Sequence, residues 1–159
     1  MSVTLLGAAV HPAPIDTFAR HDPFVHNGEL EIAQLLRRRG YNWRYEPRFY
    51  PLVYPVASGR ICFGGFTPDF YLAPNSQRPG INLEVTFADH GLPAMPREHY
   101  QANQDRLGIK RLKIQMTQDI YRVETILVTY AVFMDLRRDN SYIERLIKNA
   151  AGRHIRNAA

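Results

Sequence analysis

The chain has 159 residues, a mass of 18.3 kDa, 45% hydrophobic and 22% charged residues, which is typical of one globular domain. Its net charge of +5 comes mostly from arginine and suits either a solvated basic surface or contacts with phosphate groups. A single cysteine, Cys62, excludes an intramolecular disulfide and a cysteine-based zinc cluster, and it favours a cytoplasmic location in a bacterial or virus-infected cell. The apolar residues 1–10 are too short to span a membrane and lack a basic flank, so no membrane association is expected.

The first half of the chain predicts an arm, a helix and several strands. Residues 1–26, with three prolines, are expected to form an irregular arm. Residues 28–40 have apolar side chains at helical spacing and end in Gly40, which predicts an amphipathic helix. Aromatic and β-branched residues predict one or two edge strands over 41–56, and further short strands over 61–66, 70–73 and 81–87.

The second half predicts helices around one more strand. Pro96 indicates the start of a helix over 97–107, and Gly108 is expected to end it. Alternating apolar residues then predict a strand over 110–117. A largely buried helix over 118–138 and a last helix beginning at a capping serine are expected to complete the chain.

This order of elements predicts an α/β fold with a mixed β-sheet flanked by helices in a single domain. The arm of residues 1–26 precedes a core over 27–117, and the C-terminal helices of residues 118–159 are expected to pack on that core.

Two carboxylates lie in segments that otherwise predict buried strands. Asp69 follows Pro68 at the start of one strand, and Glu84 lies within another. If the strands pair like a hairpin, the two side chains come close, and a hard cation such as Mg²⁺ or Mn²⁺ would relieve their repulsion. The alternative is that Asp69 forms a turn after the proline and Glu84 faces solvent.

Glu29 is a third candidate acid. In a helix over 28–40 it shares the stripe of Ala33 and Leu36, which faces the core. A buried acid needs a partner, and a metal site would provide one. Alternatively, Glu29 simply favours the positive end of the helix dipole.

Three segments together resemble a known family of enzymes. GELEIAQLLRRRGYNWRYEPRFYPL, GGFTPDFYLA and INLEVTF, spread over residues 27–117, resemble nucleases of the PD-(D/E)XK superfamily, which have the restriction-endonuclease-like fold. The resemblance implies a magnesium- or manganese-dependent endonuclease that hydrolyses phosphodiester bonds, in DNA more than in RNA. It also implies that Glu29, Asp69, Glu84 and the backbone carbonyl of Val85 hold one or two Mg²⁺ or Mn²⁺ ions.

The chain departs from the family's pattern at Thr86. Most members have a lysine there, which stabilises the charge that develops on the phosphate. Members with threonine at this position draw a basic residue from the following helix, and in the helix over 97–107 Arg97 and Gln101 are the preferred substitutes. Restoring the lysine with Thr86→Lys is expected to speed turnover.

Other basic residues are candidates for contacts with the nucleic-acid backbone: Arg37, Arg38, Arg78, Lys110 and Lys113. Each also suits a solvated surface, and Lys113 in particular is expected to be a solvated residue of the strand over 110–117. His21 and His26 precede the first helix and are further candidates for the metal site.

Two functions follow from these observations. The first is a metal-dependent endonuclease. The second is an inactive protein of the same fold that binds nucleic acid, or works in a protein assembly, without cutting. Thr86 keeps the second interpretation open, and whether the chain forms a homodimer stays open as well.

Overall fold

The computed structural model describes residues 27–46, 48–55, 59–90 and 97–158. Its helices are α1 (Asn27–Arg38), α2 (Arg97–Tyr121), α3 (Tyr130–Arg138) and α4 (Tyr142–Ala158). Its strands are β1 (Trp43–Tyr45), β2 (Tyr50–Pro55), β3 (Ile61–Phe66), β4 (Phe70–Leu72), β5 (Ile81–Val85) and β6 (Glu124–Val128). The predicted arm, with His21 and His26, lies outside the described residues. Within those residues, no helix has both the length and the apolar character that crossing a membrane requires.

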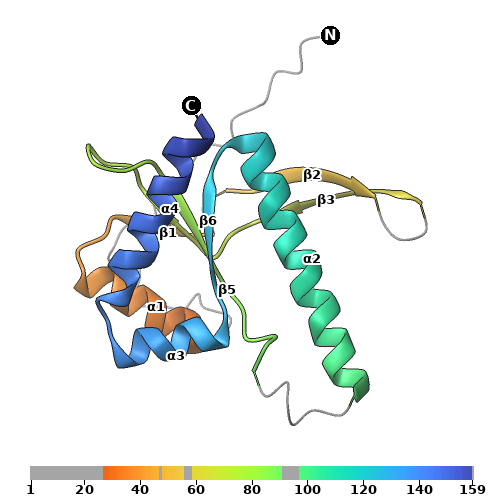
Figure 1. Ribbon diagram of the computed structural model, residues 1–159, viewed down its shortest axis with the longest axis horizontal. Coiled ribbons are helices and arrows are strands. Elements are labelled where there is room, and N and C mark those ends of the chain that lie inside the picture. Colours follow the sequence, from red (N-terminus) through yellow and green to blue (C-terminus); the bar gives the residue numbers. More distant parts are fainter. Residues whose placement is uncertain (1–26, 47, 56–58, 91–96, 159) are drawn as a thin grey trace.

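Four strands form a mixed sheet in the order β1-β4-β5-β6 (Figure 1). β4 is antiparallel to both β1 and β5, whereas β5 and β6 are parallel. Since parallel neighbours need a crossover connection, α2 serves as the crossover between β5 and β6. Among the described residues, β2 and β3 pair with each other alone and form a separate antiparallel ribbon. The prediction of a mixed α/β architecture is confirmed.

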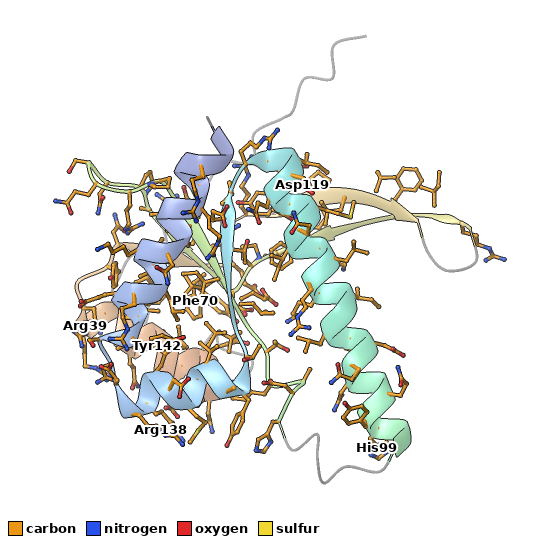
Figure 2. All side chains as sticks on the ribbon, in the orientation of Figure 1. Arg39, Phe70, His99, Asp119, Arg138 and Tyr142 are labelled. Atoms are coloured by element: carbon orange, nitrogen blue, oxygen red, sulfur yellow. The ribbon has the colours of Figure 1, made fainter. Side chains whose placement is uncertain are left out.

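The helices divide into two groups around the sheet. Figure 1 shows α1, α3 and α4 gathered on one side of it, and α2 with the β2–β3 ribbon on the other. The larger core lies under the first group, where Phe70 of β4 is fully buried among apolar residues of α1, α3 and α4 (Figure 2). A smaller cluster forms between the ribbon and α2. The two cores therefore lie on opposite sides of the sheet.

The end of α1 follows from its sequence. Gly40 has a φ of 72°, a left-handed conformation that glycine adopts at low cost. Gly40 N–H donates to the Arg37 carbonyl and Tyr41 N–H to the Leu36 carbonyl, each at 3.0 Å, which is the hydrogen-bond pattern of a Schellman motif. The predicted helix end at Gly40 is confirmed.

The predictions for residues 97–138 were wrong in two places. Residues 97–121 form one helix, so Gly108 does not end it and the predicted strand over 110–117 is helical. The predicted helix over 118–138 contains the end of α2, then β6, then α3. The predicted core over 27–117 also lacks one strand of the sheet, because β6 comes from the region assigned to C-terminal helices.

Physical reasons account for these errors. The alternation of Leu112, Ile114 and Met116 suggested a strand, yet Leu112 is exposed while the other two pack against the ribbon. α2 ends at Tyr121, and the next residue, Arg122, has a φ of 56°. This conformation is uncommon for arginine, so the sequence did not indicate the helix end. β6 is a strand because its five residues complete the ladder beside β5, a tertiary contact that outweighs local preference.

Replacing Gly108 by alanine tests whether α2 is continuous. Gly108 lies inside the helix, and nothing lies within 4 Å of the position where its Cβ would be. We expect Gly108→Ala to raise the free energy of unfolding by about 0.5–1 kcal/mol, measured by urea denaturation, because glycine is costly inside a helix. Gly40→Ala is the matched control and should destabilise, since Gly40 has a left-handed φ. A loss of stability in Gly108→Ala would contradict the continuous helix.

Candidate active site

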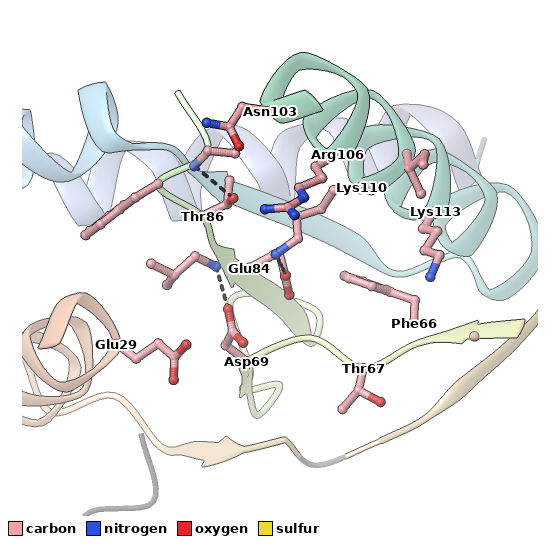
Figure 3. A pocket seen from close by; sticks show the side chains of 15 residues that line it. Glu29, Phe66, Thr67, Asp69, Glu84, Thr86, Asn103, Arg106, Lys110 and Lys113 are labelled. Atoms are coloured by element: carbon pink, nitrogen blue, oxygen red, sulfur yellow. Dashed lines mark hydrogen bonds and ion pairs between the residues drawn. The ribbon is translucent and has the colours of Figure 1, made fainter. Parts of the chain in front are cut away.

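Three carboxylates predicted to act together lie on neighbouring elements of the fold (Figure 3). Glu29 belongs to the first turn of α1, Asp69 immediately precedes β4, and Glu84 belongs to β5. Because Phe70 pairs with Leu83 in the antiparallel ladder, the next pair outward is Asp69 and Glu84. All three side chains line one cavity of about 780 Å³ between the sheet and α2. The prediction that paired strands bring Asp69 and Glu84 side by side is confirmed.

Each carboxylate has a different partner. Val85 N–H donates to Asp69 Oδ2 at 2.6 Å, and the Tyr45 hydroxyl donates to Glu29 Oε2 at 2.7 Å. Glu84 Oε1 forms an ion pair with Lys110 Nζ. The second oxygen, Glu84 Oε2, is buried and has no hydrogen-bond partner among the described residues. A buried oxygen of this kind is costly unless a cation or a donor satisfies it.

Burial and nearby negative charge raise the pKa values of two of these acids, Asp69 and Glu84. Burial, together with the nearby charge of Glu84, raises the pKa of Asp69 to about 7. Burial also raises the pKa of Glu84, and the Lys110 ammonium opposes that rise. Oxygen ligands with raised pKa values and an unpartnered buried oxygen fit a hard divalent cation. Among the residues described, however, no three acidic, histidine or cysteine side chains stand close enough together to hold one as they are.

The lysine opposite Glu84 comes from α2. Lys110 was predicted at the entrance of a strand, as a contact to the nucleic-acid backbone; the helical path of residues 97–121 instead brings it to the carboxylates. Asn103, Arg106 and Lys113 line the same cavity. Together with Lys110 they are spaced three, seven and ten residues apart, which places them on one side of the helix. Lys113 therefore faces the cavity, and its interpretation as a solvated strand residue was wrong.

The acidic and basic side chains of the cavity come from different elements, and the Lys110–Glu84 ion pair joins them. The acids come from α1 and the strands on one side, and the basic residues come from α2 on the other (Figure 3). We call the two sides the acidic floor, formed by Glu29, Asp69 and Glu84, and the basic wall, formed by Arg106, Lys110 and Lys113.

Thr86 and Val85 complete the floor. Thr86 lines the cavity and is buried, and its N–H donates to the Val128 carbonyl at 2.9 Å. Its hydroxyl accepts a hydrogen bond from Ala88 N–H at 3.4 Å, so the side chain helps to hold the end of β5. Val85 also lines the cavity, and its predicted role as a carbonyl ligand stays a prediction.

Several other predicted site residues lie elsewhere. Gln101 does not line the cavity; its amide donates to Asp105 Oδ1 at 2.9 Å on the exposed surface of α2. Arg97 begins α2, and its side chain lies outside what the structure describes. Arg37 and Arg38 occupy the last turn of α1 and line no part of the cavity.

Arg78 is also far from the acids along the sheet. It lies in the connection from β4 to β5, whereas Asp69 and Glu84 lie at the other ends of these strands. Its guanidinium stands 5.6 Å from the ring centre of Tyr41. Arg78 therefore does not lie beside the acids, and its predicted contact with the nucleic-acid backbone stays a prediction.

Asn103, Arg106 and the hydroxyl of Tyr45 were not among the site residues predicted from the sequence. Asn103 and Arg106 could have been found from their helical spacing to Lys110 and Lys113. The predicted helix end at Gly108 placed the two lysines in a different element, so this spacing was not considered. Tyr45 had no comparable signal, because its contact with Glu29 depends on how β1 lies beside α1.

The raised pKa of Asp69 predicts a pH dependence of stability. From about pH 4 to about pH 7 the folded protein keeps a proton that unfolded Asp69 has released, so the free energy of unfolding falls as pH rises. We expect this loss, on the order of a few kcal/mol, to disappear in Asp69→Asn. Urea denaturation at several pH values in EDTA, with exposed Asp119→Asn as the control, measures it. Identical pH profiles for wild type and Asp69→Asn would contradict the prediction.

Comparison with known proteins adds no relationship to these observations. No family model matches the chain, and no curated protein or solved structure is significantly similar to it.

Proposed function

We propose that the chain is a metal-dependent nuclease with a restriction-endonuclease-like fold, which hydrolyses phosphodiester bonds in nucleic acid. The observation that carries the proposal is the ion pair between Lys110 and Glu84. Most members of the family that the sequence resembles have a lysine two residues after the acid that corresponds to Glu84. Thr86 cannot provide this positive charge, whereas Lys110 of α2 lies beside Glu84. The mixed sheet with flanking helices and the acidic floor give further support.

The charged residues of the cavity then have the following chemical roles. Glu29, Asp69 and Glu84 would hold Mg²⁺ or Mn²⁺, which when bound polarises the phosphate and lowers the pKa of a water. Lys110 stabilises the negative charge that develops on the phosphate oxygens during attack. Arg106 and Lys113 contact phosphates on either side of the cleaved bond, and Tyr45 orients the Glu29 carboxylate.

A second candidate function is binding of nucleic acid without cleavage. It is favoured by the present orientation of the acids, in which Glu84 pairs with Lys110 and no three ligands converge. In that case the basic wall would bind phosphates and the ion pair would be structural.

A nicking assay separates the two functions. Supercoiled plasmid, single-stranded DNA and RNA are incubated with the full chain in Mn²⁺, Mg²⁺ or EDTA. We expect cleavage of at least one substrate with either metal ion and none in EDTA. Binding of these substrates without any cleavage in Mn²⁺ or Mg²⁺ would overturn the nuclease and favour the second function.

A further inference from the structure

The β2–β3 ribbon has an exposed apolar face. Val53 and Phe63 lie opposite each other in the ladder and are 52% and 84% exposed. Ile61 and Phe49 on the same ribbon are 65% and 57% exposed. Single exposed apolar residues are common on protein surfaces, but a contiguous group indicates an interaction site. We call these four residues the outer face of the ribbon.

The opposite face of the ribbon is packed, which holds the outer face in place. Tyr50 and Leu52 are buried against α2, and the rings of Tyr50 and Tyr121 make an edge-to-face contact with their centres 5.1 Å apart. The Tyr121 hydroxyl donates to the Pro51 carbonyl at 2.8 Å. Because side chains alternate along a strand and the inner face packs against α2, the outer face points away from α2.

The outer face leads into the candidate active site. Phe49 lies over Gly65, so close that a Cβ at Gly65 would stand 2.0 Å from its ring. Gly65 and the next residues, Phe66 and Thr67, line the cavity of the acids. A strand of nucleic acid that leaves the cavity on this side would therefore pass along the outer face.

The charges of the ribbon favour a polyanionic partner. Residues 47–68 contain no acidic residue and two arginines, Arg60 before β3 and Arg48, whose guanidinium lies over the inner-side rings of Tyr50 and Tyr121. A second copy bound through this face by twofold symmetry would bring the same positive charges together. Pro51 and Pro55 have no N–H to donate, so the free edge of β2 is poorly suited to pairing with another strand.

We propose that the outer face of the ribbon stacks on unpaired bases of the nucleic acid that enters the cavity. Phe63 supplies the largest exposed ring, and Arg60 contacts a neighbouring phosphate. Aromatic side chains stack on all four bases, so the contact selects unpaired strands irrespective of sequence. The inference rests on the proposed function for the nature of the ligand, and it adds a substrate class: nucleic acid with a single-stranded stretch beside the cleaved bond.

Binding measured without cleavage tests this proposal. The full chain is titrated in EDTA into fluorescein-labelled oligothymidine and into a blunt duplex of equal length, with fluorescence anisotropy as the readout. We expect Phe63→Leu, which stays apolar but loses the ring, to bind the single strand about tenfold more weakly. Its affinity for the duplex should stay unchanged, and Phe63→Trp should keep wild-type affinity for both. Since Phe63 is 84% exposed, none of these changes should alter thermal stability.

Because EDTA prevents cleavage, the outcomes separate this inference from the nuclease proposal. Selective loss of single-strand binding in Phe63→Leu supports the ribbon contact even if the chain cuts nothing. Unchanged binding by Phe63→Leu overturns the ribbon contact even if the wild type cuts. A light-scattering shift from dimer to monomer in Phe63→Leu, with unchanged binding, would assign the face to a second copy and overturn the proposal as well.

Discussion

Replacing Lys110 by methionine is expected to slow cleavage about 100-fold or more while leaving metal binding in place. The ammonium of Lys110 is the positive charge paired with Glu84, and loss of one stabilising charge or donor at a reacting oxygen typically has an effect of this size. Single-turnover cleavage of an oligonucleotide in saturating Mn²⁺ measures the change. Lys148→Met on the exposed surface of α4 removes the same charge elsewhere and is the matched control.

A second substitution tests whether cleavage requires Lys110 itself or only a positive charge in this cavity. Thr86 lines the same cavity, and Thr86→Lys in the Lys110→Met background moves the lysine from α2 to β5. We expect it to recover part of the lost rate. In the wild type, where Lys110 is present, Thr86→Lys is expected to bring little gain, which revises the expectation from the sequence. An unchanged rate in Lys110→Met would remove Lys110 from the mechanism.

Replacing Asp69 by asparagine is expected to abolish cleavage, with a loss of about 1,000-fold or more, in a protein that is at least as stable as the wild type at neutral pH. Asparagine keeps the acceptor for Val85 N–H and removes a charge that burial and Glu84 disfavour. The same change removes a metal ligand, so the rise in thermal midpoint that Mn²⁺ gives the wild type should disappear. Thermal unfolding with and without Mn²⁺, beside the cleavage assay, provides both readouts.

Cleavage and stability measured together in Asp69→Asn distinguish damage to the fold from loss of a catalytic group. Lost cleavage with lost stability would indicate damage to the fold. Lost cleavage with retained stability and no response to Mn²⁺ would place Asp69 in the chemistry. Cleavage at the wild-type rate in Asp69→Asn would exclude the acidic floor as the site, and exposed Asp119→Asn should behave as the wild type in every assay.

The acidic floor could be predicted from the sequence, because local patterns determine it. Glu29 lies on the apolar stripe of α1, Asp69 immediately precedes β4, and Glu84 lies on β5, the strand that pairs with β4. The register of such a pair follows from the strands themselves, so side chains fifteen residues apart in the chain could be placed together.

The basic wall could not be predicted, because its position depends on contacts distant in sequence. Glycine often follows the last residue of a helix, so Gly108 was predicted to end one, but its backbone is helical and α2 continues to Tyr121. The helix is held there by packing of Ile114, Met116 and Tyr121 on the ribbon, a contact that local preference does not contain. Once the helix is continuous, the spacing of Arg106, Lys110 and Lys113 follows directly.

The position of Lys110 on α2 has a consequence for how the site tolerates changes in length. A residue inserted or deleted between Arg97 and Lys110, with the rest of the helix held by the ribbon, displaces the earlier turns by about 100° around the helix axis and leaves Lys110 facing Glu84. The same change between Lys110 and Ile114 would turn Lys110 away from the carboxylates. The position of the Lys110 ammonium therefore depends on the number of residues between Lys110 and the packed end of α2. The positions of Asp69 and Glu84 depend instead on the register of β4 and β5.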